Sequence, residues 1–304
     1  MEVKRNQWEA WIYLAPTIFL LAVFTIYPLI NTFIMAFKTD YSYIFNTWKP
    51  MGFGNFVEVF KNQRVIQYFK NTIIITVISV PASIMLALII SVGLNSIKKF
   101  AKIYQTIFFM PYVTNSIAIG MVFSVMFSTQ YGIVNTVLNA IGVDPVNWLG
   151  GVLPSGRLVS YWSQMAVLLI YIVWNALPFK ILILLSGLQG IDKQYYQAAQ
   201  LDCATRFTVF RRITMPLLSP QITFLTTTSI IGSFKEYSSI IGIFGDTEGA
   251  TGRKYDMRTV VGYIYSTISE DQVGLGAAAA ILLFIIIMIF TGIKSLTDRR
   301  RIHY

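Results

Sequence analysis

The sequence predicts an all-α, polytopic membrane protein with six transmembrane helices and both termini in the cytoplasm. Three observations support this fold class. Of the 304 residues, 55% are hydrophobic and 12% are charged, which is about half the charged share of a soluble domain. The mean hydropathy is +0.60, and Lys and Arg collect between the apolar segments. A chain this poor in charge exposes most of its surface to lipid.

Six apolar segments are long enough to cross a hydrocarbon layer of about 30 Å, which takes about 20 helical residues. The first follows Lys4 and Arg5. It is too long for a signal peptide and lacks a small-residue cleavage site, so we expect an uncleaved span. Prolines inside or beside several segments indicate either kinked helices around a cavity or ordinary irregular packing. The expected spans are 11–36, 71–95, 103–128, 159–188, 217–243 and 275–296.

The distribution of Lys and Arg sets the orientation, because cytoplasmic loops keep an excess of positive charge. With both termini inside, the cytoplasmic segments hold thirteen Lys and Arg, whereas the longer external loops near 37–70, 129–158 and 244–274 hold nine. The segment between the fourth and fifth spans then lies in the cytoplasm. The net charge of +10 therefore reports topology and not binding to nucleic acid, which requires basic residues on one polar face.

We expect one membrane domain with short extensions, because no linker-like or low-complexity tract interrupts the chain. Residues 1–70 comprise the N-terminal tail, the first span and an external loop. Residues 71–296 form the transport core with its cytoplasmic loop 189–216, and residues 297–304 form a basic cytoplasmic tail.

Residues that commonly build catalytic or metal sites are scarce. Cys203 is the only cysteine and His303 the only histidine, which excludes an internal disulfide and His or Cys metal clusters. The sequence contains no HExxH, GxSxG or Gly-x4-Gly-Lys-Ser/Thr phosphate loop. We therefore expect no cofactor and no enzyme activity, and any ATP hydrolysis must belong to another subunit.

Residues 194–220, QYYQAAQLDCATRFTVFRRITMPLLSP, form a basic and helix-prone segment between two spans. Asp192 is a suitable N-cap for one helix and Asp202 for a second, which predicts a helical hairpin parallel to the membrane. From these residues alone, a partner protein and an anionic lipid surface fit the hairpin equally well. The second helix carries an apolar face at helical spacing, formed by Phe207, Phe210 and Ile213.

The same segment resembles the EAA loop of ABC-importer permeases, whose pattern is Glu-Ala-Ala-x3-Gly-x9-Ile-x-Leu-Pro. The matching positions run from Gln197 through Cys203 and Ile213 to Pro216. The resemblance implies a coupling helix that lies in a cleft of a cytoplasmic ATPase subunit. The residues that it assigns to this coupling are Gln197, Ala198, Ala199, Asp202, Cys203, Ala204 and Phe207.

Two positions depart from the family pattern. Gln197 replaces Glu, and an amide makes hydrogen bonds to an arginine without the charge assistance of a carboxylate. Cys203 replaces Gly, and its Cβ disfavours a left-handed turn, so we expect a tight helix contact or a different bend there. A small buried Cys203 is favoured over a reactive thiol.

The rest of the chain resembles the carbohydrate-uptake branch of this family, the maltose and glycerol-phosphate importer type. The matching segments include GFGNFVEVFKNQRVIQYFKNT, FFMPYVTNSIAIGMVFSVMFS, WNALPFKILILLSGLQGI and YIYSTISEDQVGLGAAAA, in the expected order. The resemblance implies the type I ABC importer permease fold in a bacterial plasma (inner) membrane. The stretch IFGDTEGATG lacks the proline of a Thr-x-Gly-Gly-Pro turn that relatives often carry, so we expect the outer gate or receptor contact to differ there.

The resemblance also implies the partners of the chain. They are a second permease subunit, two cytoplasmic ATPase subunits, an extracellular or periplasmic substrate-binding protein, membrane lipids and a carbohydrate substrate, with an oligosaccharide favoured. Two rival functions are a secondary transporter, which needs ion-coupling residues and usually more spans, and a membrane enzyme or receptor, which needs a catalytic cluster or a signalling domain. The sequence shows neither set of features.

Polar residues within spans are costly in lipid, so they face a cavity or one another. Alternatives stay open here: Glu236 also fits an ion pair with Lys180 or a partner subunit, the serines also fit helix-to-helix hydrogen bonds, and Trp174 fits packing better than stacking on a sugar. When the positions of the family are matched to this sequence one by one, the resemblance places substrate-facing residues on the fourth and fifth spans. They are Asn175, Ala176, Phe179, Ser229, Gly232, Ser233 and Glu236.

Overall fold

The computed structural model describes residues 7–97, 101–150, 159–245 and 255–299. Within these ranges the regular structure is helical, apart from two isolated β-bridges. The chain divides into two compact units. One comprises residues 1–66 and 262–285, and the other comprises residues 67–261 and 286–304. The division of the chain into functional segments that the sequence suggests stays a prediction.

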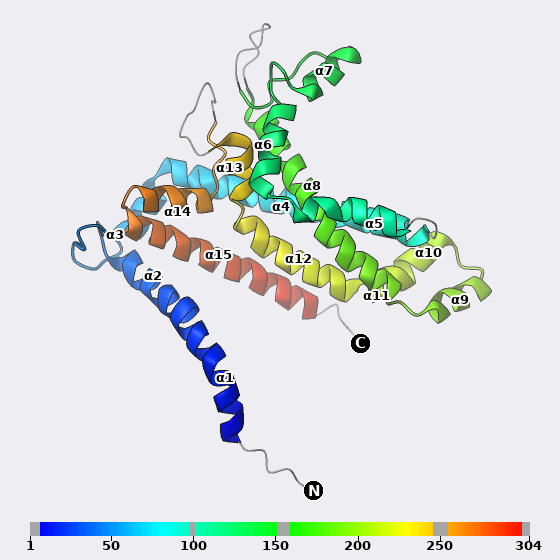
Figure 1. Ribbon diagram of the computed structural model, residues 1–304, viewed down its shortest axis with the longest axis horizontal. Coiled ribbons are helices and arrows are strands. Elements are labelled where there is room, and N and C mark those ends of the chain that lie inside the picture. The colour runs from blue at the N-terminus through cyan, green and yellow to red at the C-terminus, as the bar shows by residue number, and fades with distance from the viewer. Residues whose placement is uncertain (1–6, 98–100, 151–158, 246–254, 300–304) are drawn as a thin grey trace. The chain divides into compact units, whose positions relative to one another are not determined.

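The first unit contains the first predicted span. Helix α1 (Gln7–Leu21), the π-helical turn η1 (Ala22–Ile26) and helix α2 (Tyr27–Phe37) follow one another as an apolar helical segment. Pro28 lies just after the π-turn, where its missing N–H breaks the regular bonding pattern and accounts for the local change in helix type. The unit also contains α3 (Gly54–Lys61), most of α14 (Val260–Ser269) and the start of α15 (Val273–Arg299) (Figure 1).

Between α2 and α3 the chain makes a hairpin, residues 38–53, whose two sides meet at the bridges Lys38–Met51 and Ser42–Thr47. The buried Asn55 side chain donates to the carbonyl of Lys38 at 2.9 Å. At the start of α15, a Cβ on Gly274 would lie 2.7 Å from the same carbonyl oxygen. The hairpin is therefore fixed against both neighbouring helices of its unit.

The second unit is built around α8 (Tyr161–Gln189). Buried Tyr171 and Met165 belong to one apolar cluster with α13, and Ile181 and Leu184 belong to another with α4 and α12. The elements of this unit are most of α4 (Gln63–Ser96), α5 (Ala101–Phe109), η2 (Met110–Val113), α6 (Ser116–Met126), α7 (Ile133–Ala140), α8, α9 (Lys193–Leu201), α10 (Arg206–Val209), η3 (Phe210–Thr214), α11 (Met215–Leu217), α12 (Ser219–Phe234), α13 (Ser238–Phe244), the first residues of α14 and the C-terminal part of α15 (Figure 1).

Four helical segments are long and apolar enough to cross a membrane. They agree with four of the predicted spans, 11–36, 71–95, 159–188 and 275–296. The observed segments are Ala10–Phe37, Gln63–Ser96, Tyr161–Gln189 and Val273–Leu296.

The predicted third span, 103–128, is broken. Helical segments Ile103–Val113 and Ser116–Met126 meet at an angle of 97°. Asn115 begins the second segment as its N-cap, because its side chain accepts from the N–H groups of Ile117 and Ala118. The break therefore has a local cause in the sequence PYVTNS.

The predicted fifth span, 217–243, is also interrupted. Helix α12 ends at Phe234 and α13 begins at Ser238. Counting the bent third pair, up to five spans among the described residues pass by length and composition. The count of six and the cytoplasmic location of both termini stay predictions.

Candidate functional site

Residues 192–217 form the predicted helical hairpin, here called the coupling hairpin. Its first helix, α9, begins at Asp192, whose carboxylate accepts from the N–H of Gln194 at 2.9 Å. It ends in a Schellman motif: Cys203 N–H donates to the Gln200 carbonyl at 3.1 Å, and Ala204 N–H donates to the Ala199 carbonyl at 3.0 Å. Both ends of α9 are thus satisfied by local bonds.

Cys203 lies in the left-handed conformation with φ of 52°, and its side chain is exposed. The expectations of a tight helix contact or a different bend, and of a buried thiol, are therefore wrong. The Schellman motif demands a left-handed residue at this position, so the backbone keeps the turn that glycine would favour. The Cβ of Cys203 carries a strain of about 1–2 kcal/mol.

Asp202 does not cap the second helix, contrary to the sequence prediction. An N-cap needs extended backbone dihedrals, but Asp202 has φ −77° and ψ 4° because it closes α9. Thr205, with φ −67° and ψ 153°, is the N-cap instead, and its Oγ1 accepts from the N–H of Thr208 at 3.3 Å. Helix α10 therefore begins at Arg206.

The coupling hairpin presents an uneven surface. Ala199 is only 6% exposed, whereas Leu201 is 86% and Phe207 is 70% exposed. Ala199 packs against the chain itself, and its assignment to the coupling residues stays a prediction. Of the other assigned residues, Ala204 is half-buried and four are exposed: Gln197, Ala198, Asp202 and Cys203.

The predicted apolar face of the second helix is divided. Phe207 is exposed, but Phe210 and Ile213 are half-buried. The reason is the π-helical turn η3, which changes the register of the side chains after Val209. Leu201, which the family pattern does not mark, is a second large apolar side chain of the coupling hairpin that is exposed.

A second group of predicted residues lies at the break between α5 and α6. The ring of Phe179 stacks on Tyr112 with 6.0 Å between centroids and 17° between planes. Asn175 Nδ2 lies 3.5 Å from Ser116 Oγ, and the Ser116 carbonyl accepts from Tyr171 at 2.5 Å. Tyr112 is 57% exposed. The break thus combines an open aromatic face with hydroxyl and amide groups.

Sequence reasoning missed Tyr112 and Ser116. The signal that was available is the run MPYVTNS, in which Pro111 and the N-capping Asn115 predict a helix break within an apolar segment. Trp174 contributes to packing, as expected, because its ring centroid lies 5.5 Å from that of Phe123.

The predicted residues of the fifth span lie around the second break. Ser233 is 8% exposed, and its Oγ lies 3.4 Å from Ser79 Oγ on α4, which agrees with the helix-to-helix alternative. The Glu236 carboxylate accepts from the N–H of Ser239 at 3.1 Å at the start of α13. Ser229 and Ala176 are half-buried and Gly232 is exposed.

Lys180 has a partner other than Glu236. It is 5% exposed and donates to Ser83 Oγ on α4. The ion pair with Glu236, which the sequence left open, is therefore replaced by a hydrogen bond between neighbouring helices.

The two breaks meet where α6 crosses α13. A Cβ on Gly120 would lie 2.7 Å from Gly242 Cα, and a Cβ on Gly242 would lie 2.8 Å from the carbonyl oxygen of Ile117. Backbone thus contacts backbone at this crossing, as small residues allow between membrane helices. The crossing joins the C-terminal halves of both broken spans.

A family model described as "Binding-protein-dependent transport system inner membrane component" matches residues 51–303. The chain belongs to this family. This permease is accordingly a multi-pass inner-membrane protein and a transport subunit of a binding-protein-dependent ABC importer, not an enzyme. As its family description states, such a component depends on a binding protein.

Two relatives and one solved structure show how far the permease resembles known proteins. The lactose transport system permease protein LacF of Rhizobium radiobacter is 30% identical over 284 residues, which cover 92% of this permease and 90% of LacF. The arabinooligosaccharides transport system permease protein AraP of Halalkalibacterium halodurans is 28% identical over 289 residues, which cover 92% and 84%.

The solved structure is a bacterial alginate ABC transporter in complex with an alginate pentasaccharide-bound periplasmic protein. One of its chains matches the permease with a TM-score of 0.78 and 24% identity, and the match covers 97% of the permease and 96% of that chain. At this level of identity the match shows a shared fold.

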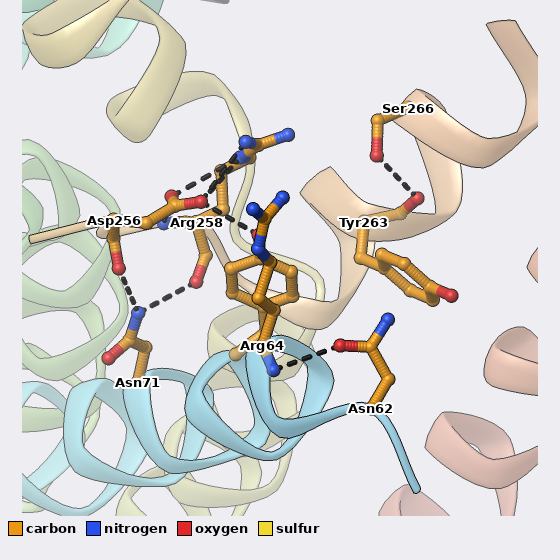
Figure 2. A network of polar contacts seen from close by, with 8 residues as sticks. Asn62, Arg64, Asn71, Asp256, Arg258, Tyr263 and Ser266 are labelled. Carbon is orange, nitrogen blue, oxygen red and sulfur yellow. Dashed lines mark hydrogen bonds and ion pairs between the residues drawn. The ribbon is translucent and has the colours of Figure 1, made fainter. Parts of the chain in front are cut away.

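The permease also contains a polar network that sequence reasoning missed. Asn71 on α4 donates to the carbonyls of Asp256 at 3.1 Å and Arg258 at 2.8 Å. The Asp256 carboxylate forms an ion pair with the Arg258 guanidinium at 3.0 Å and accepts a hydrogen bond from the Tyr68 hydroxyl at 2.7 Å. Figure 2 shows Asn71, Asp256 and Arg258 converging over α4. The network fixes the segment before α14 to α4.

One predicted feature of the permease is not described. The stretch IFGDTEGATG covers 243–252, and residues 246–252 lie outside the described residues. Gly245, the last described residue before that gap, has φ of 75°, a conformation that glycine adopts without strain.

Proposed function

We propose that this permease moves an oligosaccharide that an extracellular or periplasmic binding protein delivers. A second, paralogous permease subunit and two cytoplasmic ATPase subunits complete the importer. The relatives support the substrate class, because LacF is named for lactose and AraP for arabinooligosaccharides. The observation that carries the proposal is the stacked pair of Tyr112 and Phe179 beside Asn175 at the break between α5 and α6.

The chemistry of this break suits a sugar. A pyranose ring has C–H groups that pack on an aromatic face and hydroxyls that exchange hydrogen bonds with amides and other hydroxyls. Tyr112 supplies the exposed ring and Phe179 supports it from α8. Asn175 and Ser116 supply the polar groups. The proposed site includes these four residues together with Ala176, Ser229 and Gly232.

Ser233 and Glu236 have a structural role in this proposal. Ser233 ties α12 to α4 through Ser79, and Glu236 caps α13. They position the second break rather than touch the sugar, and they therefore set the distance between the two halves of the fifth span.

The coupling hairpin is proposed to dock on an ATPase subunit through exposed Tyr195, Leu201 and Phe207. Its motion reaches the spans through a continuous path. Tyr196 OH lies 3.3 Å from Thr214 Oγ1, and fully buried Leu218 joins α11 to α12. A displacement of the hairpin therefore moves α12, which leads to the second break.

Uptake by the complete importer in proteoliposomes tests the substrate class. With the binding protein outside and ATP inside, radiolabelled oligosaccharides of different composition are offered in turn. We expect ATP-dependent accumulation of at least one oligosaccharide. Accumulation of an amino acid or an ion in place of every sugar would contradict the proposal.

The site itself is tested by removing its aromatic face. Tyr112→Leu and Phe179→Leu should each reduce uptake about tenfold or more, because an aromatic face contributes about 1–3 kcal/mol to a stacked ligand. Tyr131→Leu is the matched control, since Tyr131 is 86% exposed and follows the end of α6 at Met126, whereas the break lies at the start of α6. Equal uptake by all three variants would remove the aromatic pair from the sugar site.

A further inference from the structure

The tip of the hairpin between α2 and α3 exposes a run of large apolar side chains. Tyr43 is 67%, Ile44 is 72% and Phe45 is 76% exposed. The adjoining polar residue at the turn, Asn46, has φ of 48°. Exposed apolar side chains that are contiguous mark contact with a protein or a membrane.

The hairpin is fixed at the level where two spans of its unit end. The apolar segment of α2 ends at Phe37, directly before the hairpin, and the segment of α15 begins at Val273. Asp271, two residues before Val273, accepts from the Ser42 hydroxyl at 2.5 Å and from the Tyr43 N–H at 3.0 Å. The hairpin tip is thus tied to the chain just outside a span.

The hydrogen bonds from Ser42 and Tyr43 to Asp271, here called the tether, limit how far the tip can lie from the membrane. Asp271 and Val273 are two residues apart, and two extended residues span at most about 7 Å. Phe45 follows Tyr43 by two residues, which adds at most about 7 Å more. Apolar groups of interfacial segments insert about 5–10 Å into the boundary between headgroups and acyl chains. The three side chains therefore lie within reach of the lipid headgroups.

The tether also holds at neutral pH. The Ser42 hydroxyl, and after it the backbone N–H groups of Tyr43 and Ile44, lower the pKa of Asp271 below its ordinary value. The carboxylate that accepts these bonds stays ionised down to acidic pH.

Aromatic residues around a cation complete an interfacial pattern at the base of the hairpin. Lys38 Nζ lies 4.2 Å from the centre of the Trp48 ring and 4.8 Å from that of Tyr41. Lys49 pairs with Asp40 at 2.5 Å, and residues 41–48 contain no charged side chain. Trp and Tyr concentrate at the membrane–water boundary, where lysines also place their charge.

We propose that residues 41–48 form an interfacial anchor, in which Tyr43, Ile44 and Phe45 insert among the lipid headgroups on the side where α2 ends. Lipid is the occupant because the tip is tied beside the start of the apolar α15 segment and follows in sequence from α2, whose apolar side chains are also exposed, Ile30 by 54% and Ile34 by 43%. The anchor holds the ends of α2 and α15 at a constant depth during transport. Figure 1 shows the hairpin beside α2 and α3 of its unit.

The depth of the tip is measured with a nitroxide on Ile44→Cys in a Cys203→Ser background. The assembled importer is placed in lipid nanodiscs without binding protein, and the signal of the background alone is subtracted. The readout is the ratio of collision rates with oxygen, which concentrates in lipid, and with a water-soluble nickel chelate. Two positions supply the references: Ile30→Cys on α2 for lipid, and exposed Asn139→Cys on α7 for water.

We expect the ratio at Ile44 to be several-fold above the aqueous reference and close to the lipid reference. A ratio equal to that of Asn139→Cys overturns the proposal. So does a probe that stays aqueous until the binding protein is added, because the tip would then be a protein-docking surface. Should Ile44→Cys fail to assemble, Tyr43→Cys gives the same decision.

Discussion

The coupling hairpin and the pair of broken spans differ in how the chain defines them. The hairpin is closed by short-range bonds: the Asp192 cap, the Schellman motif at Cys203 and the Thr205 cap. The helices after the breaks begin at local caps, Asn115 and Glu236, but the broken spans are held together by contacts between distant segments, above all the crossing of Gly120 and Gly242. In the proposed function the hairpin moves as one piece, and local bonds give it that integrity. The proposed sugar site depends instead on contacts between helices.

The largest expected effect is the difference between placing a charge at a buried and at an exposed position of the coupling hairpin. Ala199→Asp places an unpaired charge at a position that is 6% exposed, which costs about 3–5 kcal/mol. We expect loss of the assembled importer and a strongly lowered thermal midpoint. Leu201→Asp, at 86% exposure, should instead preserve assembly and ATP hydrolysis while uptake falls about tenfold or more.

Size-exclusion chromatography, ATPase rate and uptake on the same preparations check both variants. Normal assembly of Ala199→Asp would show that the position is open to solvent. Normal uptake by Leu201→Asp would show that the exposed tip of α9 does not contact the ATPase subunit.

The crossing of the broken spans should be sensitive to a single methyl group. Gly242→Ala brings Cβ to 2.8 Å from the Ile117 carbonyl oxygen, and overpacking of this kind costs about 1–3 kcal/mol. Gly93→Ala is the matched control, because its Cβ meets no atom within 4 Å. The thermal midpoint of the purified importer should fall for Gly242→Ala and stay unchanged or rise for Gly93→Ala. Equal midpoints would mean that α6 and α13 are not in backbone contact.

Asp202 and Thr205 differ in whether they cap helix α10, a role that the sequence alone assigned to Asp202. Thr205→Ala removes the acceptor for Thr208 N–H and should cost about 1 kcal/mol, whereas Asp202→Ala should cost less because its side chain caps no helix. The thermal midpoints of the two variants measure the order. A larger loss for Asp202→Ala would restore Asp202 as the cap.

The sequence predicts those features that short segments encode. Apolar length locates four spans, Asp192 marks the start of α9, and the EAA-like spacing identifies the coupling hairpin. Asp202 is misplaced as a cap because an acidic residue suits both ends of a turn, and the backbone dihedrals that decide between them follow from the Schellman motif. The burial of Ala199 likewise depends on packing that the family pattern does not encode.

The candidate site is predicted only in part for the same reason. Asn175 and Phe179 follow from the family resemblance, but their partners Ser116 and Tyr112 come from a different span. The network around Asn71 joins residues 185 positions apart in sequence at the Asp256 carbonyl. Neither pairing has a periodic or local signal, since each depends on how distant helices pack.

The smallest expected effect concerns Cys203, the residue of the coupling hairpin with a left-handed backbone conformation. Cys203→Gly relieves about 1–2 kcal/mol of left-handed strain, but glycine gains about 0.5–1 kcal/mol of freedom in the unfolded chain. The net stabilisation should be about 0.5–1 kcal/mol, seen as a slightly higher thermal midpoint. Cys203→Ala keeps the Cβ and should show no such gain. If Cys203→Gly lowers the midpoint as much as Gly242→Ala does, the thiol makes a contact in the assembled importer, and the integrity of the hairpin is no longer purely local.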